Sequence, residues 1–323
     1  MMTKQYVFIT RKLPEEVVQS LREQFEVNMW HSDTMAVPRE ILLEEAGKAD
    51  ALLTMLSDKV DRELLTRSSN LKVVANLAVG FDNIDLEAAK ENNVLICNTP
   101  DVLTDTTADL AFALLMATAR KIPQAVQIVK SGEWRSWGPL LFTGADIHHK
   151  TIGIVGMGKI GSAVAKRATG FDMEILYHNR NPKPEVEAAV GAKYCSFEQL
   201  VQQSDFIVCL TPLTPETKNL FTEEVFKQMK PSAIFINAAR GAVVDEEALY
   251  RVLKDKVIAA AGLDVFQVEP IDAHHPLLTL DNVVALPHIG SASAETRSAM
   301  MALCAENIQL VLNGKVPKTI VKS

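Results

Sequence analysis

The stretch GIVGMGKIGSAVAK, Gly153–Lys166, decides the fold class of this chain. It places Gly156, Gly158 and Gly161 in G-x-G-x-x-G spacing, after an apolar run and before a helical pattern. Glycine at these positions permits a tight strand-to-helix turn and a close approach of the backbone to a pyrophosphate. The N-terminus of the following helix supplies N–H donors for the phosphates. The motif in this context predicts a dinucleotide site.

On both sides of this motif, short apolar runs alternate with helical patterns. From Lys150 onward the apolar runs are KTIGIVG, MEILYHN, DFIVCLT, SAIFINA, VIAAAGLDVF and NVVALPHI. The first hundred residues contain a similar series, with YVFIT, EVNMW, ADALLTML, LKVVANLAV and VLICNTP as its strands. Such alternation predicts parallel sheets with helices on both faces. We therefore predict an α/β protein with two Rossmann-like, doubly wound domains.

Two helical patterns lie outside this alternation. One runs from Thr106 to about Lys130, is unusually apolar in DLAFALLMATA, and is expected to be one long helix, buried or shared with a partner. The loop SGEWRSWGPLLFTGADIHHK follows it. The other pattern, roughly Ala294 to Asn313, is expected to pack back on the first domain. The substrate domain is then discontinuous, residues 1–100 with 290–323, and residues 101–289 form the dinucleotide-binding domain.

Composition and charge restrict the class of protein. The net charge of -7 argues against nucleic acid as the main partner, because a phosphate backbone attracts clustered Lys and Arg. No apolar run approaches the ~18 residues that span a bilayer, and charged residues come too early for a signal-peptide core. The four cysteines are scattered without a CxxC pair, which predicts reduced thiols and a cytoplasmic protein. The His pairs lack metal-site spacing, so no metal is expected.

The residues after the strand MEILYHN bear on the choice of cofactor. Asn179 stands where an NAD site usually presents a carboxylate to the ribose 2′-OH. Arg180 offers a planar cation suited to a 2′-phosphate, and Lys183 can assist it. The alternative is that Arg180 is a solvated loop charge. We predict that NADP(H) is preferred, with NAD(H) as the alternative cofactor.

Three polar residues follow later strands and suggest a reaction. FINAARG places Arg240 just after a strand, Glu269 ends GLDVFQVE, and His288 lies at the end of the last strand. Reduction of a ketone needs a proton donor, and histidine is the usual one near neutral pH. A carboxylate can stabilise its protonated ring, and an arginine can hold a substrate carboxylate at two points. A loop histidine, a solvated turn and a structural ion pair are the respective alternatives. Together the three predict a 2-oxo acid reductase.

These residues lie in motifs that resemble those of the D-isomer-specific 2-hydroxyacid dehydrogenases. Besides the glycine motif, the matching stretches are NLAVGFDNIDLEAA, NTPDVLTDTTADLA, PLTPETKNLF, FINAARGAVVDEEAL, AAGLDVFQVEP and PHIGSAS. They follow the family's order over essentially the whole chain. Within the family, the sequence is most similar to the glyoxylate/hydroxypyruvate reductases, including the bacterial branch that also reduces 2-ketogluconate.

The resemblance implies roles for further residues. It assigns the backbone N–H groups of Val79 and Gly80 to the substrate carboxylate, and Asp264 with the carbonyl of Ala238 to the nicotinamide carboxamide. It implies a homodimer built through the cofactor domain, with Trp137 either reaching the partner's active site or packing locally. The remaining residues assigned to the cofactor are Lys159, Ile160, Thr211, Pro212 and Gly290, together with Arg240.

Some features separate this chain from its relatives. Many members of the family carry an acidic residue where Asn179 stands. Membership in the family therefore does not by itself assign NAD as the cofactor of this chain. Formate dehydrogenases carry Gln at the position of Glu269, so the Glu–His pair favours a keto/hydroxy couple. Two alternatives stay open at the level of sequence: an NAD-linked dehydrogenase running oxidatively, and a non-catalytic, corepressor-like binding protein on the same fold.

Overall fold

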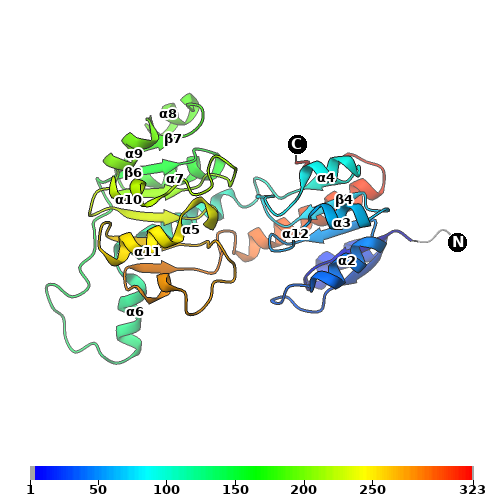
Figure 1. The fold of residues 1–323 in the computed structure, drawn as a ribbon, viewed down its shortest axis with the longest axis horizontal. Coiled ribbons are helices and arrows are strands. Elements are labelled where there is room, and N and C mark those ends of the chain that lie inside the picture. Colours follow the sequence, from blue (N-terminus) through cyan, green and yellow to red (C-terminus); the bar gives the residue numbers. More distant parts are fainter. Residues whose placement is uncertain (1–3, 322–323) are drawn as a thin grey trace. The chain divides into compact units, whose positions relative to one another are not determined.

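Two parallel sheets organise the computed structural model, which describes residues 4–321. The chain divides into two units, shown in Figure 1. Unit 1 consists of Met1–Leu103 with Ser293–Ser323, and unit 2 consists of Thr104–Ala292.

The sheet of unit 1 has five parallel strands in the order β2-β1-β3-β4-β5. The strands are β1 (Tyr6–Ile9), β2 (Glu26–Met29), β3 (Ala51–Thr54), β4 (Val73–Asn76) and β5 (Leu95–Cys97). Every residue of β3 and β4 is buried, as expected for central strands of a parallel sheet that is covered on both faces.

Helices cover both faces of this sheet. They are α1 (Glu15–Arg22), α2 (Arg39–Lys48), α3 (Arg62–Arg67), α4 (Leu86–Glu91) and α12 (Ala294–Leu312). Helices α2, α3 and α4 share one apolar cluster with the sheet, whereas α12 packs against α1, β3 and β4 (Figure 1). The prediction that the last helix packs on the first domain is confirmed. Its buried side chains, among them Met300, Cys304 and Ile308, complete the core on that face.

The sheet of unit 2 has seven parallel strands in the order β12-β11-β10-β9-β6-β7-β8. The strands are β6 (Thr151–Val155), β7 (Glu174–His178), β8 (Lys193–Tyr194), β9 (Phe206–Cys209), β10 (Ile234–Asn237), β11 (Ala260–Leu263) and β12 (Val283–Ala285). The chain reverses its direction of winding between β6 and β9, and ligands of open α/β sheets bind beyond the strand ends at such a point.

The helices of unit 2 again form two layers. They are α5 (Thr104–Ala119), α6 (Ile122–Lys130), α7 (Lys159–Thr169), α8 (Pro184–Val190), α9 (Phe197–Gln203), α10 (Glu223–Lys227) and α11 (Glu246–Lys254). Helices α5 and α7 pack on one face of the sheet, and α9, α10 and α11 pack on the other. The predicted fold class, two α/β domains with parallel sheets, is confirmed.

Two predictions about elements were wrong or incomplete. The single helix from Thr106 to Lys130 is two helices, because Lys121 adopts a left-handed backbone conformation (φ 52°) and Pro123 lies in the first turn of the next helix. Helix α8 and strand β8 were not predicted. A two-residue strand and a short helix that begins at a proline carry too little periodicity to be recognised.

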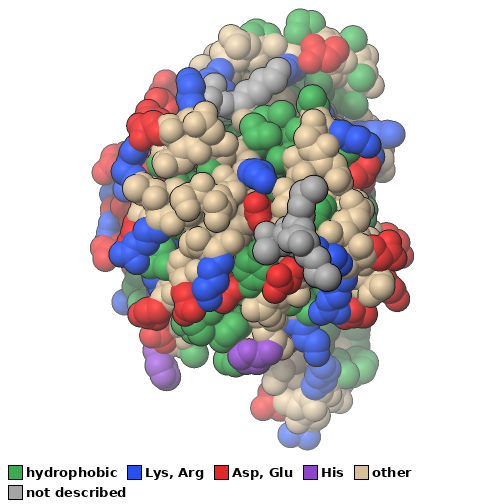
Figure 2. Space-filling view, turned by 90° about the vertical axis from the view of Figure 1, so that its right-hand side faces the viewer, with side chains coloured by type: hydrophobic (Ala, Val, Ile, Leu, Met, Phe, Trp, Pro, Cys, Tyr) green, Lys and Arg blue, Asp and Glu red, His purple; other side chains and the backbone are tan. Residues whose placement is uncertain are grey.

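On the face drawn in Figure 2, neither positive nor negative side chains gather in one large patch. Lys and Arg side chains lie beside Asp and Glu side chains there, interspersed with hydrophobic ones. A surface that binds a nucleic-acid backbone instead gathers its basic residues in one patch. Within residues 4–321, no helix is long and apolar enough to cross a membrane.

Candidate active site

The glycine motif forms the turn between β6 and α7, and its three glycines meet different surroundings. Gly156 has φ 102°, and a Cβ added there would lie 2.8 Å from the backbone of Leu210. A Cβ on Gly161 would lie 2.3 Å from the Gly156 carbonyl oxygen, so the helix packs closely on its strand. A Cβ on Gly158 would meet nothing within 4 Å. Gly158 is also the N-cap of α7 and provides no side-chain cap, so this open space at a helix N-terminus fits a pyrophosphate.

The loop after β7 carries the residues predicted to choose the cofactor. It is held by Tyr177, a fully buried side chain whose hydroxyl accepts a hydrogen bond from the Lys183 N–H (2.6 Å) and donates one to Glu187 (2.7 Å). Burial, with the Glu187 hydrogen bond, raises the pKa of Tyr177 to about 12. Sequence reasoning did not assign Tyr177 a function, and its only signal was its place at a strand end.

The two cations of this loop lie at the C-terminal edge of the sheet, and Lys183 is half-buried. Arg180 is exposed, and its charge lies close enough to Glu216 to help the Thr214 hydrogen bond lower the pKa of that carboxyl. The Lys183 ammonium lies 3.9 Å from a carboxylate oxygen of Glu185. Glu216 lies in the segment that follows β9, which also contains the predicted residues Thr211 and Pro212.

A histidine and a glutamate form a pair beyond β11 and β12. Nδ1 of His288 lies 2.7 Å from Oε2 of Glu269, and Oε1 of Glu269 accepts a hydrogen bond from the Phe266 N–H (2.9 Å). Burial acts to raise the pKa of Glu269, but the hydrogen bond and charge of His288 outweigh it, so the pKa lies below its ordinary value. Glu269 is therefore an ionised partner for the imidazole near neutral pH. His288 has φ 53°, a left-handed conformation of the kind that is retained at functional sites.

Arg240 lies in the turn after β10, and Asn237 shapes that turn. The Asn237 side chain is buried, accepts a hydrogen bond from the Ala239 N–H (3.1 Å) and donates one to the Arg240 carbonyl (3.0 Å). A Cβ on the next residue, Gly241, would lie 1.9 Å from the Phe266 carbonyl carbon, so only glycine permits this approach of the two turns. Sequence reasoning missed Asn237, which orients Arg240 through the backbone.

The arginine lies near the His–Glu pair, because Gly241, which follows it, packs against Phe266, whose N–H donates to Glu269. The charge of Arg240 also helps lower the pKa of Glu269. The structure thus brings Arg240, Glu269 and His288 together at the edge of the sheet that also bears the glycine turn.

Asp264 follows β11 and joins the neighbouring strand ends. Its carboxylate, almost fully buried, accepts hydrogen bonds from the N–H groups of Ile289 (2.7 Å) and Gly290 (2.9 Å). Burial raises the pKa of Asp264 despite these donors. Asp264 thereby fixes the segment that carries His288. Ala238 lies on the neighbouring strand end, one residue beyond β10.

The remaining predicted residues lie in other segments of the chain. Val79 and Gly80 are in unit 1, in the turn after β4. Trp137 lies in the segment after α6, with 79% of its surface exposed. Lys159 and Ile160 begin α7, directly after the glycine turn.

The cluster in unit 2 has the parts that a reduction by a dinucleotide requires. The glycine turn can bind a pyrophosphate. His288, hydrogen-bonded to Glu269, can supply a proton, and Arg240 can bind an anion.

Comparisons with known proteins show which family has a similar sequence and fold. The family model described as D-isomer specific 2-hydroxyacid dehydrogenase, NAD binding domain, matches residues 112–290. The chain is 51% identical over 322 residues to a glyoxylate reductase of Thermococcus onnurineus, covering 98% of this chain and 96% of the relative.

Two solved structures resemble the whole chain. One is the TT0316 protein from Thermus thermophilus, with a TM-score of 0.92 and 42% identity, covering 98% of this chain and 100% of the other. The second is an NADPH-dependent glyoxylate/hydroxypyruvate reductase from Sinorhizobium meliloti in complex with NADP and malonate. It has a TM-score of 0.85 and 31% identity, covering 99% of this chain and 97% of the other.

Proposed function

The chain belongs to the D-isomer specific 2-hydroxyacid dehydrogenase family, and we propose that it is an NADPH-preferring reductase of small 2-oxo acids. The observation that carries the proposal is the hydrogen-bonded Glu269–His288 pair beside Arg240, at the sheet edge that also bears the glycine turn. The reductase names of the relatives support the same reaction class.

In the proposed reaction, His288 donates a proton to the carbonyl oxygen of the 2-oxo acid. When bound, the reduced nicotinamide supplies the hydride to the carbonyl carbon. Glu269 stays ionised and stabilises the imidazolium before transfer, because its pKa lies below the ordinary value. After transfer the ring is neutral and is recharged from solvent for the next turnover. The product is a D-2-hydroxy acid.

Substrate orientation is assigned to an arginine and to two backbone groups. Arg240 binds the substrate carboxylate and polarises the adjacent carbonyl, because a guanidinium makes charge-assisted hydrogen bonds to both kinds of oxygen. The N–H groups of Val79 and Gly80 are proposed to bind the same carboxylate. Asp264 and the Ala238 carbonyl are proposed to hold the nicotinamide carboxamide.

The preference for NADPH rests on the loop after β7. Asn179 brings no charge to the position where a carboxylate would repel a 2′-phosphate, and Arg180 and Lys183 add two cations. Tyr177 keeps this loop in one conformation through its two hydrogen bonds. The Sinorhizobium meliloti reductase, whose structure contains NADP, provides a precedent for this cofactor on the same fold.

The substrate range proposed is glyoxylate, hydroxypyruvate and 2-ketogluconate. Each offers a carboxylate for Arg240 and an adjacent carbonyl for His288. They differ in the substituent beyond that carbonyl, and one methylene or hydroxyl in a pocket changes affinity only modestly.

We also propose that the protein works as a cytoplasmic homodimer, joined through unit 2. Its free cysteines agree with a reducing compartment. Hydrophobic side chains of α6 and of the following segment are exposed, including Val129, Trp137, Leu140 and Leu141. Exposed apolar side chains gathered in one region mark an interface. Trp137 is proposed to reach the active site of the partner subunit.

Product analysis tests the proposed reaction. The purified protein is incubated with NADPH and glyoxylate, hydroxypyruvate or 2-ketogluconate, while the loss of NADPH absorbance is followed. We expect NADPH oxidation matched by hydroxy acid, and D-glycerate from hydroxypyruvate. L-glycerate, or no oxidation with any of the three acids, would contradict the proposal.

A further inference from the structure

In the turn after β4, three consecutive carbonyl groups are each bound by a donor of unit 1. The pairs are the Thr99 N–H to the Ala78 carbonyl (2.8 Å), the Asn98 side-chain amide to the Val79 carbonyl (2.8 Å), and the Asn76 side-chain amide to the Gly80 carbonyl (3.1 Å). The orientation of three successive peptide planes is thereby fixed.

A fixed carbonyl also fixes the N–H of the next residue. In a trans peptide the C=O and the following N–H point in opposite directions. The N–H groups of Val79, Gly80 and Phe81 therefore point away from the groups that hold the carbonyls. Within residues 4–321, these three N–H groups have no protein acceptor. Successive N–H groups in a turn can form an anion-binding concavity, and these three lie in the turn after β4.

We propose that Asn98 is a positioning residue for substrate binding, which aims the Gly80 N–H at the carboxylate of the 2-oxo acid, with the Phe81 N–H as a third donor. This inference rests on the proposed function and deepens it. Asn98 contacts the Val79 carbonyl and acts on the substrate only through that peptide plane.

Asn98 is itself held in place. It directly follows β5, and its own carbonyl accepts a hydrogen bond from the Thr319 hydroxyl (2.7 Å). That hydroxyl accepts one in turn from the Asn307 side chain of α12 (2.8 Å). The last helix and the segment after it therefore stabilise the residue that orients the turn.

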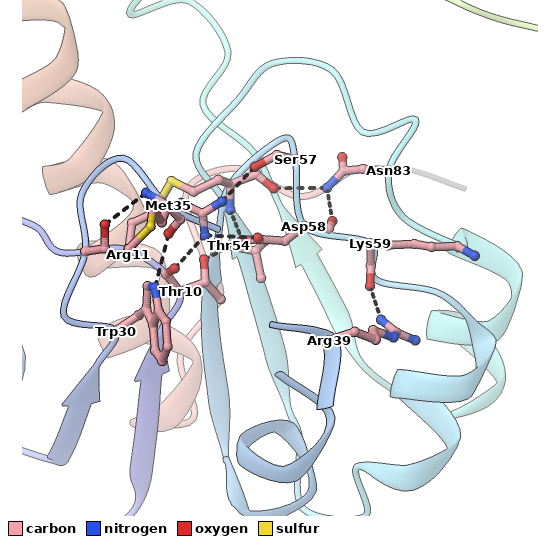
Figure 3. A network of polar contacts seen from close by, with 12 residues as sticks. Thr10, Arg11, Trp30, Met35, Arg39, Thr54, Ser57, Asp58, Lys59 and Asn83 are labelled. Atoms are coloured by element: carbon pink, nitrogen blue, oxygen red, sulfur yellow. Dashed lines mark hydrogen bonds and ion pairs between the residues drawn. The ribbon is translucent and has the colours of Figure 1, made fainter. Parts of the chain in front are cut away.

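The other side of the turn is fixed by a second network. The buried Asn76 accepts a hydrogen bond from the Thr54 hydroxyl (3.1 Å), and its amide also lies 3.3 Å from the Asn83 side-chain oxygen. Asn83 donates to the carbonyls of Met55 (3.3 Å) and Asp58 (2.9 Å), as Figure 3 shows.

The loop after β3, which receives the Asn83 hydrogen bonds, is anchored by an ion pair. Asp58 is buried with Arg11, whose guanidinium lies 3.2 Å from the carboxylate, and Thr10 and the Met55 N–H (2.8 Å) also donate to it (Figure 3). The turn is therefore supported by a rigid polar network, as precise positioning of a binding group requires.

The test compares Asn98→Ala and Asn98→Asp with a control variant. In the control, Asn282→Ala, the lost amide also donates to backbone carbonyls, those of Leu253 and Ala259 (both 3.1 Å), in unit 2. For each variant we measure the melting temperature, kcat and KM for glyoxylate, KM for NADPH, and the inhibition constant of oxalate.

We expect Asn98→Ala to raise the glyoxylate KM and the oxalate inhibition constant about tenfold, the equivalent of one to two hydrogen bonds. The kcat and the NADPH KM should stay within about twofold of the wild type, because His288 and the cofactor site are untouched. Asn98→Asp should raise KM further, because a carboxylate cannot donate to the Val79 carbonyl and repels the substrate anion. Asn282→Ala should change stability without changing either constant.

Unchanged KM and oxalate inhibition in a folded Asn98 variant would overturn the inference while the proposed function stands. If Asn98→Ala does not fold, Asn98→Asp, which keeps the side-chain volume, gives the same readouts. An equal rise in KM in Asn282→Ala would also overturn it, because the effect would then be a general loss of stability. If the wild type reduces no 2-oxo acid, the proposed function and this inference fail together.

Discussion

At the scale of single residues, the chemistry depends on the two carboxylate oxygens of Glu269, which have different partners. One carboxylate oxygen accepts the Phe266 N–H and the other faces His288, so the carboxylate fixes both the turn and the ring. The ring is then oriented before substrate binds, which lowers the cost of reaching the reactive geometry.

His288→Ala is expected to lower kcat by roughly 10²–10⁴, because the proton donor is lost. The dissociation constant of NADPH should be nearly unchanged, because His288 is not assigned to the phosphates. Steady-state kinetics and a fluorescence titration with NADPH measure the two effects. His274→Ala, which removes an exposed histidine of the same unit, should keep normal turnover. Near-normal turnover of His288→Ala would mean that another group supplies the proton.

Glu269→Gln is expected to lower kcat by roughly 10² or more, because a neutral amide no longer stabilises the imidazolium that donates the proton. Stability should change in a pH-dependent way as well. The folded-state pKa of Glu269 lies below its ordinary value, so its contribution to the free energy of unfolding is present above the unfolded-state pKa. That contribution is lost as the pH falls through the folded-state pKa.

The stability difference between wild type and Glu269→Gln should therefore shrink in acid, which denaturant unfolding at several pH values measures. A kcat of Glu269→Gln equal to that of the wild type would show that Glu269 does not act on the histidine.

At the scale of elements, the loop after β7 is the segment that chooses the cofactor. Arg180→Ala is expected to raise the KM for NADPH about tenfold and leave the KM for NADH unchanged, because only NADPH carries the 2′-phosphate. Arg251→Ala, which removes a surface cation of α11, serves as the control and should affect neither cofactor. Equal effects of Arg180→Ala on both cofactors would remove the 2′-phosphate role.

The sequence predicted the elements that carry strong local signals. The glycine turn and the strand ends bearing Arg240 and His288 were found because apolar strands precede them and their residue types are informative on their own. The break between α5 and α6 was missed, although Pro123 signals a helix boundary in the sequence. The left-handed conformation of Lys121 that ends the first helix has no such signal, because lysine rarely adopts it.

The supporting residues could not be found in this way. Asn98, Asn237 and Tyr177 act through hydrogen bonds to backbone or side-chain groups in turns. Asparagine after a strand is common and has many structural uses, so its type alone does not reveal which carbonyl it binds. That information exists only once the neighbouring strand ends are placed in space.

At the scale of the whole molecule, the proposed homodimer gives a prediction of mass. The wild type should scatter light as a species of twice the chain mass of 35.5 kDa. Val129→Asp should shift this equilibrium toward the monomer, because it places a charge on the exposed apolar face of α6, where Val129 is 60% exposed.

Val316→Asp is the matched control, since Val316 is 79% exposed but lies in unit 1, outside the proposed interface. Size-exclusion chromatography with light scattering distinguishes the variants. A monomeric wild type, or a dimer unaffected by Val129→Asp, would contradict an interface formed by α6.

The central claim is that the chain reduces 2-oxo acids with NADPH, through the cluster at the C-terminal edge of the unit 2 sheet. The most direct measurement is the initial rate with hydroxypyruvate, comparing NADPH with NADH at matched concentrations. We expect turnover with a clearly higher kcat/KM for NADPH. A preference for NADH would contradict the 2′-phosphate site at Arg180, and no turnover with either cofactor would contradict the reductase itself.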